Sequence, residues 1–205
     1  MKINRLAVRL CMCALVLFRA LSLYADGKDS LSRKMIHIAG IDVKPAYVFP
    51  THEFFSGNNA TFSPIRKNLS VHLKYGFKFA PDPYFGRMYP HGVQGIGVGY
   101  NTFFHSSELG TPWSVYAFQT SRIASLTPRL SLDYEWNFGA SFGWKKYDAE
   151  SNPYNRVVGS KMNAYIHLSF LLNWQLDAQT NLRAGIGATH FSNGNTAYPN
   201  AGVNT

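Results

Sequence analysis

The chain has 205 residues, of which only 15% are charged, 15% are aromatic and 46% are hydrophobic. An ordinary soluble domain has about 25% charged residues, and a disordered chain has far less hydrophobic content. The mean hydropathy is nevertheless only −0.15, and beyond the N-terminus no segment approaches the ~20 apolar residues of a membrane-spanning helix. The composition therefore excludes disorder and a bundle of membrane helices, and favours a fold with one apolar and one uncharged polar surface.

The N-terminal 25 residues have the pattern of a secretory signal peptide. Three basic residues precede the apolar run 10–18, and Ala25 provides a small residue before a cleavage point. We therefore predict a signal peptide at 1–25. Both cysteines, Cys11 and Cys13, lie inside it, so the exported chain is expected to contain no thiol, disulfide or cysteine metal site.

Export also changes the balance of charge. The net charge is +9 for the whole chain and falls to +5 without the signal peptide, since 16 basic and 11 acidic residues remain. This excess is small and scattered. Nucleic acid is therefore not expected as a partner, and a weak attraction to anionic lipid headgroups is the more natural interpretation.

Apolar and polar residues alternate through most of the exported chain. From Leu130 to Lys145 the even-numbered residues are apolar and the odd-numbered ones are polar or small. A strand of this length, at about 3.3 Å per residue, is far longer than the usual five or six residues. The same alternation occurs at 69–79 and 162–176. Less regular strands are expected at 34–49, 93–104, 113–122 and 180–192.

Long strands with one apolar face occur in soluble sandwiches or lipocalin-like barrels, with that face inward, and in outer-membrane barrels, with that face outward. Strand length favours the membrane barrel, whose tilted strands need about 9–11 residues to span the bilayer. Aromatic residues near the strand ends fit the interfacial girdles of such barrels (Trp113, Trp144, Trp174 and Tyr100). We therefore predict an all-β, antiparallel, transmembrane outer-membrane β-barrel over residues 26–205.

The connections between the predicted strands alternate in length, which gives an orientation. Outer-membrane barrels have long outer loops and short periplasmic turns, so the N-terminus is expected in the periplasm. Seven strands are an odd number, whereas bacterial single-chain barrels are even-numbered. We expect about eight strands in the complete protein, with the last one missing here. The long connections are 50–68 and 146–160, 105–112 is intermediate, the short ones are 123–129 and 177–180, and 80–92 is an exception.

The last predicted strand ends in a short constellation of polar residues, by which we mean His190, Ser192, Asn193 and Gly194 together with the following residues 199–204. His190 and Ser192 have the same parity as the apolar residues from Leu182 to Ala188, so both are expected to point out of the barrel wall. Thr180 and His190 are about 33 Å apart along the strand, which corresponds to about 25 Å of height in the membrane. His190 is therefore expected near the outer edge of the apolar band. An ionisable side chain facing lipid indicates a functional site. The alternative is that the strand breaks at Thr189 and His190 begins a solvated turn.

The stretch His190-Phe191-Ser192-Asn193-Gly194 resembles the His-x-Ser-Asn motif of the outer-membrane lipid A deacylases, the PagL-like acyloxyacyl hydrolase family. The resemblance implies an eight-stranded barrel that hydrolyses the ester-linked 3-position acyl chain of lipid A at its outer wall. The partner implied is lipid A, or lipopolysaccharide, of the outer leaflet of a gram-negative bacterium. Further similar segments extend it over nearly all of 40–205 (44–50, 94–100, 128–144 and 152–155).

The same resemblance implies roles for individual residues. Ser192 is expected to be the nucleophile and His190 the base that takes its proton. Asn193 and the backbone N–H of Gly194 are expected to stabilise the oxyanion. The family pattern has Glu where this sequence has Asn204. An amide can orient the imidazole but cannot stabilise its cation by charge, and the corresponding change in a serine triad cost about 10⁴ in rate.

Other candidate sites in the sequence are weaker. Asp133 and Glu135 have the parity of the barrel interior and are expected to form stabilising polar pairs there. The alternating glycines of 95–99 are expected at a close contact between strands. No residue pattern indicates a cofactor or a metal site. The alternative function is a non-catalytic barrel, structural or a narrow pore, in which Asn204 marks lost activity.

Overall fold

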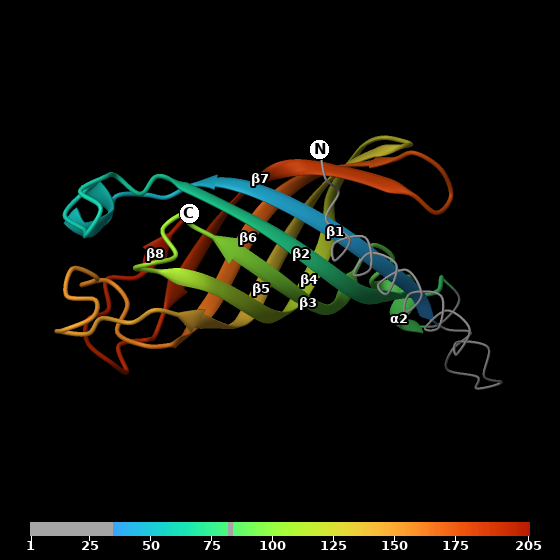
Figure 1. Cartoon of the computed structure of the whole chain (residues 1–205). Coiled ribbons are helices and arrows are strands. Elements are labelled where there is room, and N and C mark those ends of the chain that lie inside the picture. Colours follow the sequence, from blue (N-terminus) through green and yellow to red (C-terminus); the bar gives the residue numbers. More distant parts are fainter. Residues whose placement is uncertain (1–34, 82–83) are drawn as a thin grey trace, which may run out of the picture.

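The computed structural model describes residues 35–81 and 84–205, so the predicted signal peptide lies outside the described residues. Eight antiparallel strands form a single curled sheet, in which each strand pairs with the next along the chain (Figure 1). No helix in the described part of the chain is long and apolar enough to cross a membrane. The strands are β1 (Met35–Tyr47), β2 (Lys67–Phe79), β3 (Val93–Thr102), β4 (Gly110–Thr127), β5 (Leu130–Trp144), β6 (Met162–Gln175), β7 (Asn181–Ser192) and β8 (Val203–Asn204).

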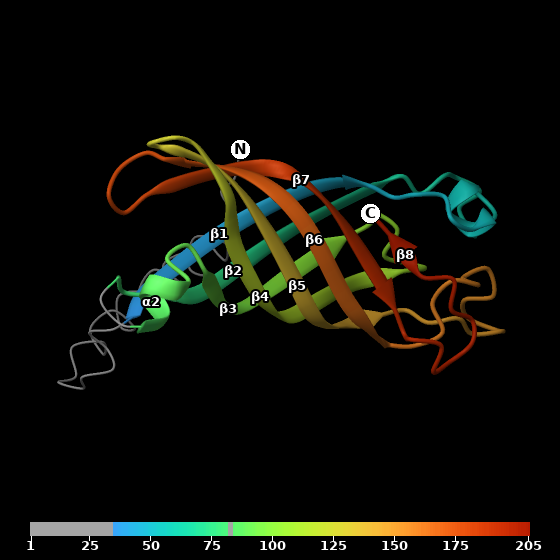
Figure 2. The same cartoon turned by 180° about the vertical axis from the view of Figure 1, so that it is seen from behind.

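The seven long strands confirm the alternation found in the sequence, whereas the two-residue β8 was not predicted. Two residues carry no periodicity, so only the tertiary structure reveals this strand. It pairs with the end of β7, where Asn204 lies opposite His190 and Val203 opposite Phe191 (Figure 2). The backbone N–H of Phe49 also donates to the carbonyl of Asn204, at 3.0 Å. Strand β8 therefore links β7 to the chain that follows β1.

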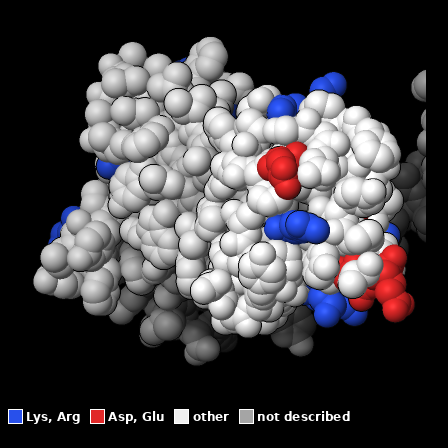
Figure 3. Space-filling model, turned by 90° about the vertical axis from the view of Figure 1, so that its left-hand side faces the viewer, with Lys and Arg blue, Asp and Glu red and all other residues white. Residues whose placement is uncertain are grey.

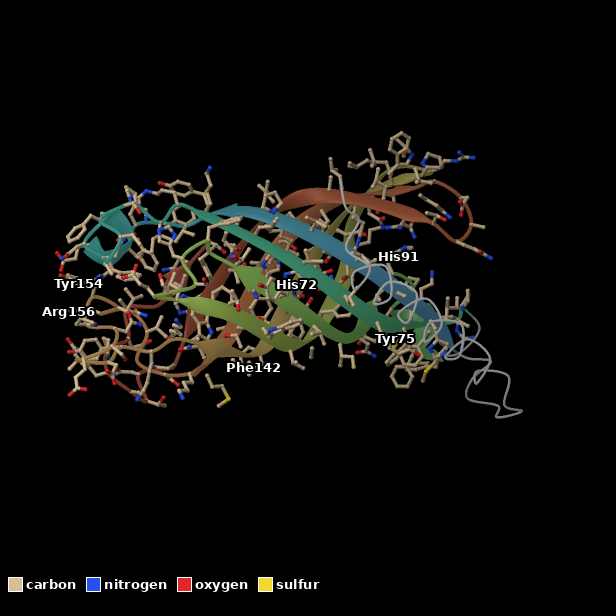
Figure 4. All side chains as sticks on the ribbon, viewed as in Figure 1. His72, Tyr75, His91, Phe142, Tyr154 and Arg156 are labelled. Carbon is tan, nitrogen blue, oxygen red and sulfur yellow. The ribbon has the colours of Figure 1, made fainter. Side chains whose placement is uncertain are left out.

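The two faces of the sheet differ as expected for a membrane barrel. On β2, His72 and Lys74 are buried inside, whereas Val71, Leu73 and Tyr75 are exposed outside. Figure 4 shows His72 among the strands and Phe142 projecting away from them. A soluble sandwich or lipocalin would bury the apolar face instead. The soluble alternative is therefore wrong, and the fold is that of an outer-membrane β-barrel.

A network of charges from four strands fills the middle of the barrel. The ammonium of Lys74 (β2) contacts Asp42 (β1) at 2.9 Å and also contacts Glu135 (β5). Arg183 (β7) bridges the same two carboxylates, at 3.0 Å to Asp42 and 3.1 Å to Glu135. Asp133 accepts hydrogen bonds from neighbouring polar side chains. Asp133 and Glu135 thus occupy the interior, as the sequence predicted, and their partners are ones that the sequence did not identify.

The glycines of β3 make room for rings inside the barrel. A Cβ atom on Gly97 would lie 2.4 Å from the ring of Tyr116, and one on Gly99 would lie 2.4 Å from the imidazole of His72. Tyr116 donates or accepts a hydrogen bond with His72 at 3.0 Å, so the two rings form one buried pair. The close contact predicted for these glycines is confirmed.

One aromatic residue departs from the predicted outer girdle. Trp144 is 2% exposed and points into the molecule, whereas Trp113, Trp174 and Tyr100 are exposed on the outside. The reason is Gly143, whose φ of +89° interrupts the alternation at the end of β5. The residue after this glycine therefore changes face. The expectation that Trp144 belongs to the girdle is wrong.

The long connections gather at one end of the sheet, which we call the loop end (Figure 1). It holds residues 48–66 with the 3₁₀ helix η3 (Glu53–Ser56), and residues 103–109, 145–161 and 193–202. The opposite end, which we call the turn end, holds two short turns and the helix α2 (Tyr84–Met88). Beneath the loops lies a cluster of buried apolar residues that includes Phe54, Phe55, Phe103, Leu109, Trp144, Val157, Phe191 and Val203.

Candidate active site at the end of strand β7

Strand β7 continues without a break through His190 and ends at Ser192. His190 pairs with Ile166 of β6, and Ser192 pairs with Ala164, so the register is unbroken to the last residue. The alternative that the strand breaks at Thr189 is therefore wrong. His190 and Ser192 both lie on regular strand backbone.

The neighbours of these two residues show which way they point. Arg183 reaches the buried charges, Thr189 bonds to the ring of His167 at 2.9 Å, and Phe191 is 2% exposed. All three are odd-numbered and face the interior. Since side chains alternate along a strand, His190 and Ser192 lie on the outer face of the sheet, as their parity predicted.

Phe191 fixes this segment from the inside. Its ring packs against Trp144 at 5.1 Å, Tyr165 at 5.5 Å and Phe103 at 6.2 Å between ring centroids. Aromatic contacts of this kind add to the free energy of burial. The residue between His190 and Ser192 is thus an anchor, and it limits how far the outer pair can move.

Asn204 lies beside His190 because β8 pairs with β7. Two backbone hydrogen bonds between Thr189 and Thr205 continue this pairing, at 2.7 and 2.9 Å. The side-chain carbonyl Oδ1 of Asn204 lies 2.7 Å from Nδ1 of His190. A carbonyl can only accept, so this contact places the imidazole proton on Nδ1 and leaves Nε2 with a free lone pair. The neutral imidazole can then act as a base at Nε2.

Gly202 brings the returning chain close to the same imidazole. Its φ of +72° is a left-handed conformation, and a Cβ there would lie 2.9 Å from Cε1 of His190. Glycine therefore satisfies both the backbone conformation and the short approach. No motif in the sequence assigned a role to this position.

The hydroxyl of Ser192 has two partners in the loop that follows it. It donates to Oδ1 of Asn200 at 3.3 Å and accepts from the backbone N–H of Gly194 at 3.1 Å. Among the described residues, no hydrogen bond joins Ser192 to His190. Asn200 is therefore a neighbour of the candidate nucleophile to which the sequence pattern assigned no role.

The two predicted oxyanion donors differ in their surroundings. The side-chain amide of Asn193 donates to the carbonyl of Ala197 at 2.7 Å, and its backbone N–H donates to Asn200 at 3.3 Å. The side chain of Asn193 thus stabilises the loop in this arrangement. The N–H of Gly194 already points at the Ser192 oxygen, and the space beside its Cα is open. Gly194 therefore has the better position of the two.

Metal-ligating side chains do not gather anywhere in residues 35–81 and 84–205 in groups of three or more. The constellation at the end of β7 instead combines a hydroxyl, an oriented imidazole and a backbone N–H. These are the groups that acyl transfer by a serine nucleophile requires.

Comparison with known proteins identifies a family. The model of the family described as lipid A 3-O-deacylase (PagL) matches residues 94–205, which is more than half of the chain. The match begins one residue inside β3, extends through β8 and includes His190, Ser192, Asn193, Gly194 and Asn204. Neither the curated proteins nor the solved structures gave a match. The chain belongs to the PagL family of lipid A 3-O-deacylases, which are hydrolases of the outer membrane.

Proposed function

We propose that the protein hydrolyses the ester-linked 3-position acyl chain of lipid A, with Ser192 and His190 as its catalytic residues. The observation that carries this proposal is the 2.7 Å contact between Asn204 and His190, beside a serine on the outer face of the sheet. An orienting partner, a base and a nucleophile in this order form the general arrangement of a catalytic triad.

In the proposed reaction, the Ser192 Oγ attacks the ester carbonyl carbon while its proton moves to Nε2 of His190. The carbonyl oxygen becomes an oxyanion, and the N–H of Gly194 is the nearest donor to stabilise it. The intermediate then expels the sugar C3 oxygen, which takes the proton from His190. Water, activated by the same imidazole, hydrolyses the acyl-serine and restores the hydroxyl.

Before the attack, Ser192 must turn from Asn200 toward His190. The hydroxyl bond to Asn200 is long, at 3.3 Å, so this rotation breaks a weak contact. Asn200 therefore holds the resting hydroxyl, and an arriving ester would compete with it for the Ser192 oxygen.

The substrate would approach sideways from the outer leaflet. With the loop end facing outward, the constellation lies at the upper end of an apolar surface that includes Leu182, Ile186 and Ile166. An acyl chain can lie along this surface while the sugar stays above it among the loops. Figure 3 shows the loop end, where cationic and anionic side chains lie near one another. Such a surface matches a phosphorylated sugar without strongly attracting every anion.

The interior of the barrel gives little support to the alternative function of a narrow pore. The charged network of Lys74, Arg183, Asp42 and Glu135 occupies the middle of the barrel, and the rings of Tyr116 and Tyr165 lie above it, nearer the loop end. Side chains usually fill barrels of this size. A non-catalytic structural barrel is the remaining alternative, and lipid A chemistry separates it from the esterase.

The test is mass spectrometry of lipid A from gram-negative cells that express the chain, or its variants His190→Ala and Ser192→Ala. We expect loss of one 3-hydroxyacyl group with the unmodified chain only. His91→Ala removes an exposed histidine at the turn end and is the matched control, which should remain active. Heat-dependent gel mobility establishes that each barrel is folded. Unchanged lipid A with a folded, unmodified chain would exclude the proposed activity.

A further inference from the structure

The turn end carries an exposed apolar cluster that has no role in the proposed reaction. We call Tyr84, Phe85, Met88 and Tyr89 the α2 cluster. Each of these side chains is between 52% and 63% exposed, although they lie within six consecutive residues. Helix α2 lies at the opposite end of the barrel from β8 and the long loops (Figure 1). Contiguous exposed apolar groups of this kind mark a surface that something else covers.

The α2 cluster continues the apolar outer surface of the barrel. The ring of Phe85 stacks on that of Phe79, with centroids 5.4 Å apart and planes 30° apart. Phe79 in turn meets Phe77 edge to face at 6.0 Å. Both belong to the outward set of β2, together with Tyr75. The cluster and the lipid-facing wall therefore form one surface.

The position of α2 is fixed by close packing. A Cβ on Gly86 would lie only 1.7 Å from the carbonyl oxygen of Ala80, which directly follows β2. The helix can lie this near the strand end only because residue 86 is glycine. Its aromatic side chains are therefore held at a defined height on the barrel.

We propose that helix α2 is an interfacial anchor whose aromatic cluster inserts among the lipid headgroups of the periplasmic leaflet. Tyrosine and other aromatic side chains are enriched at membrane interfaces, where an apolar ring and a polar tip are both satisfied. The proposal depends on the membrane orientation given above and not on catalysis.

A second protein is a less suitable occupant of this surface. An aromatic side chain offers about 150–250 Å² in total, so four half-exposed side chains supply roughly 400 Å². A stable protein interface buries about 800 Å² on each partner. The cluster alone is too small for such an interface, but it is large enough to enter a lipid surface with which it is already continuous.

The test measures the depth of a single fluorophore. In the chain with Cys11→Ser and Cys13→Ser, an environment-sensitive dye is attached at Met88→Cys, and at Tyr84→Cys as an independent second site. Leu73→Cys, in the lipid-facing wall, and Tyr198→Cys, in the exposed loop after β7, are the matched controls. The proteins are refolded into phosphatidylethanolamine and phosphatidylglycerol vesicles, with folding checked by heat-dependent gel mobility.

Quenching by aqueous iodide on both sides of the vesicles is compared with quenching by brominated lipids. We expect dye at positions 84 and 88 to be quenched by bromine atoms placed near the headgroups. Iodide should quench dye at these two positions at least threefold less than it quenches dye at position 198. Iodide quenching equal to that at position 198 would overturn the proposal. Protection from both quenchers would also overturn it, because a second copy of the chain would then cover the cluster.

Discussion

The substitution Asn204→Asp isolates the electrostatic part of the proposed triad. Aspartate has nearly the same shape as asparagine, so the 2.7 Å contact with Nδ1 of His190 should persist. The side-chain nitrogen of Asn204 has no hydrogen-bond partner among the described residues, so replacing it with oxygen breaks no contact. The change adds one negative charge beside the imidazole and little else.

The expected gain follows from Coulomb's law. Two unit charges about 4 Å apart attract by about 1 kcal/mol in water and by about 4 kcal/mol at an effective dielectric constant of 20. The imidazole is half-buried, so the stabilisation of its cation lies between these limits. Because each 1.36 kcal/mol changes the rate tenfold, we expect deacylation to become about 5 to 1,000 times faster.

The assay is the initial rate of release of the 3-hydroxyacyl chain from purified lipid A in detergent, measured by mass spectrometry. Asn195→Asp adds the same charge in the loop after β7, where Asn195 is exposed, and should leave the rate unchanged. A rate for Asn204→Asp that equals or falls below that of the parent, with a folded barrel, would refute the reasoning that a negative charge beside His190 accelerates deacylation.

Four further changes test other parts of the structure. Gly202→Ala should displace the imidazole of His190 and reduce deacylation at least tenfold while the barrel stays folded, because its Cβ would lie 2.9 Å from the ring. Phe191→Ala should lower the free energy of unfolding in urea by about 3–5 kcal/mol, since this ring is 2% exposed; a loss below 1 kcal/mol would contradict its role as an anchor. Glu135→Gln should lower the free energy of unfolding in urea by about 3–5 kcal/mol with deacylation retained, because it leaves the buried cation of Lys74 and the partly buried cation of Arg183 with one carboxylate. Hydrogen bonds from backbone N–H groups and a serine hydroxyl hold the pKa of Asp148 below its ordinary value of 3.8. The turn at this residue is therefore stabilised above that pH and loses this stabilisation as the pH falls through the lower pKa. Relative to the variant Asp148→Asn, which lacks the carboxylate at every pH, the parent's loop 145–161 should therefore resist pepsin better near pH 4 and lose this advantage as the pH falls.

The sequence by itself determined the strands and their two faces. Alternation over ten or more residues is a local property, so β2, β5 and β6 and the outward direction of His190 and Ser192 follow from parity alone. Parity fails where the backbone leaves the extended conformation. The positive φ of Gly143 turns Trp144 inward, and no rule of alternation contains that information.

The tertiary structure decided what depends on contacts between distant segments. Strand β8 exists because the chain after β7 folds back, and this return brings Asn204 to His190 across 14 residues. The charged network joins β1, β2, β5 and β7, and its partners are up to 141 residues apart. Asn200 and Gly202 have roles only through that same returning loop. Periodicity fixes the direction of a side chain from its own strand, but it carries no information on which other segment the side chain will meet.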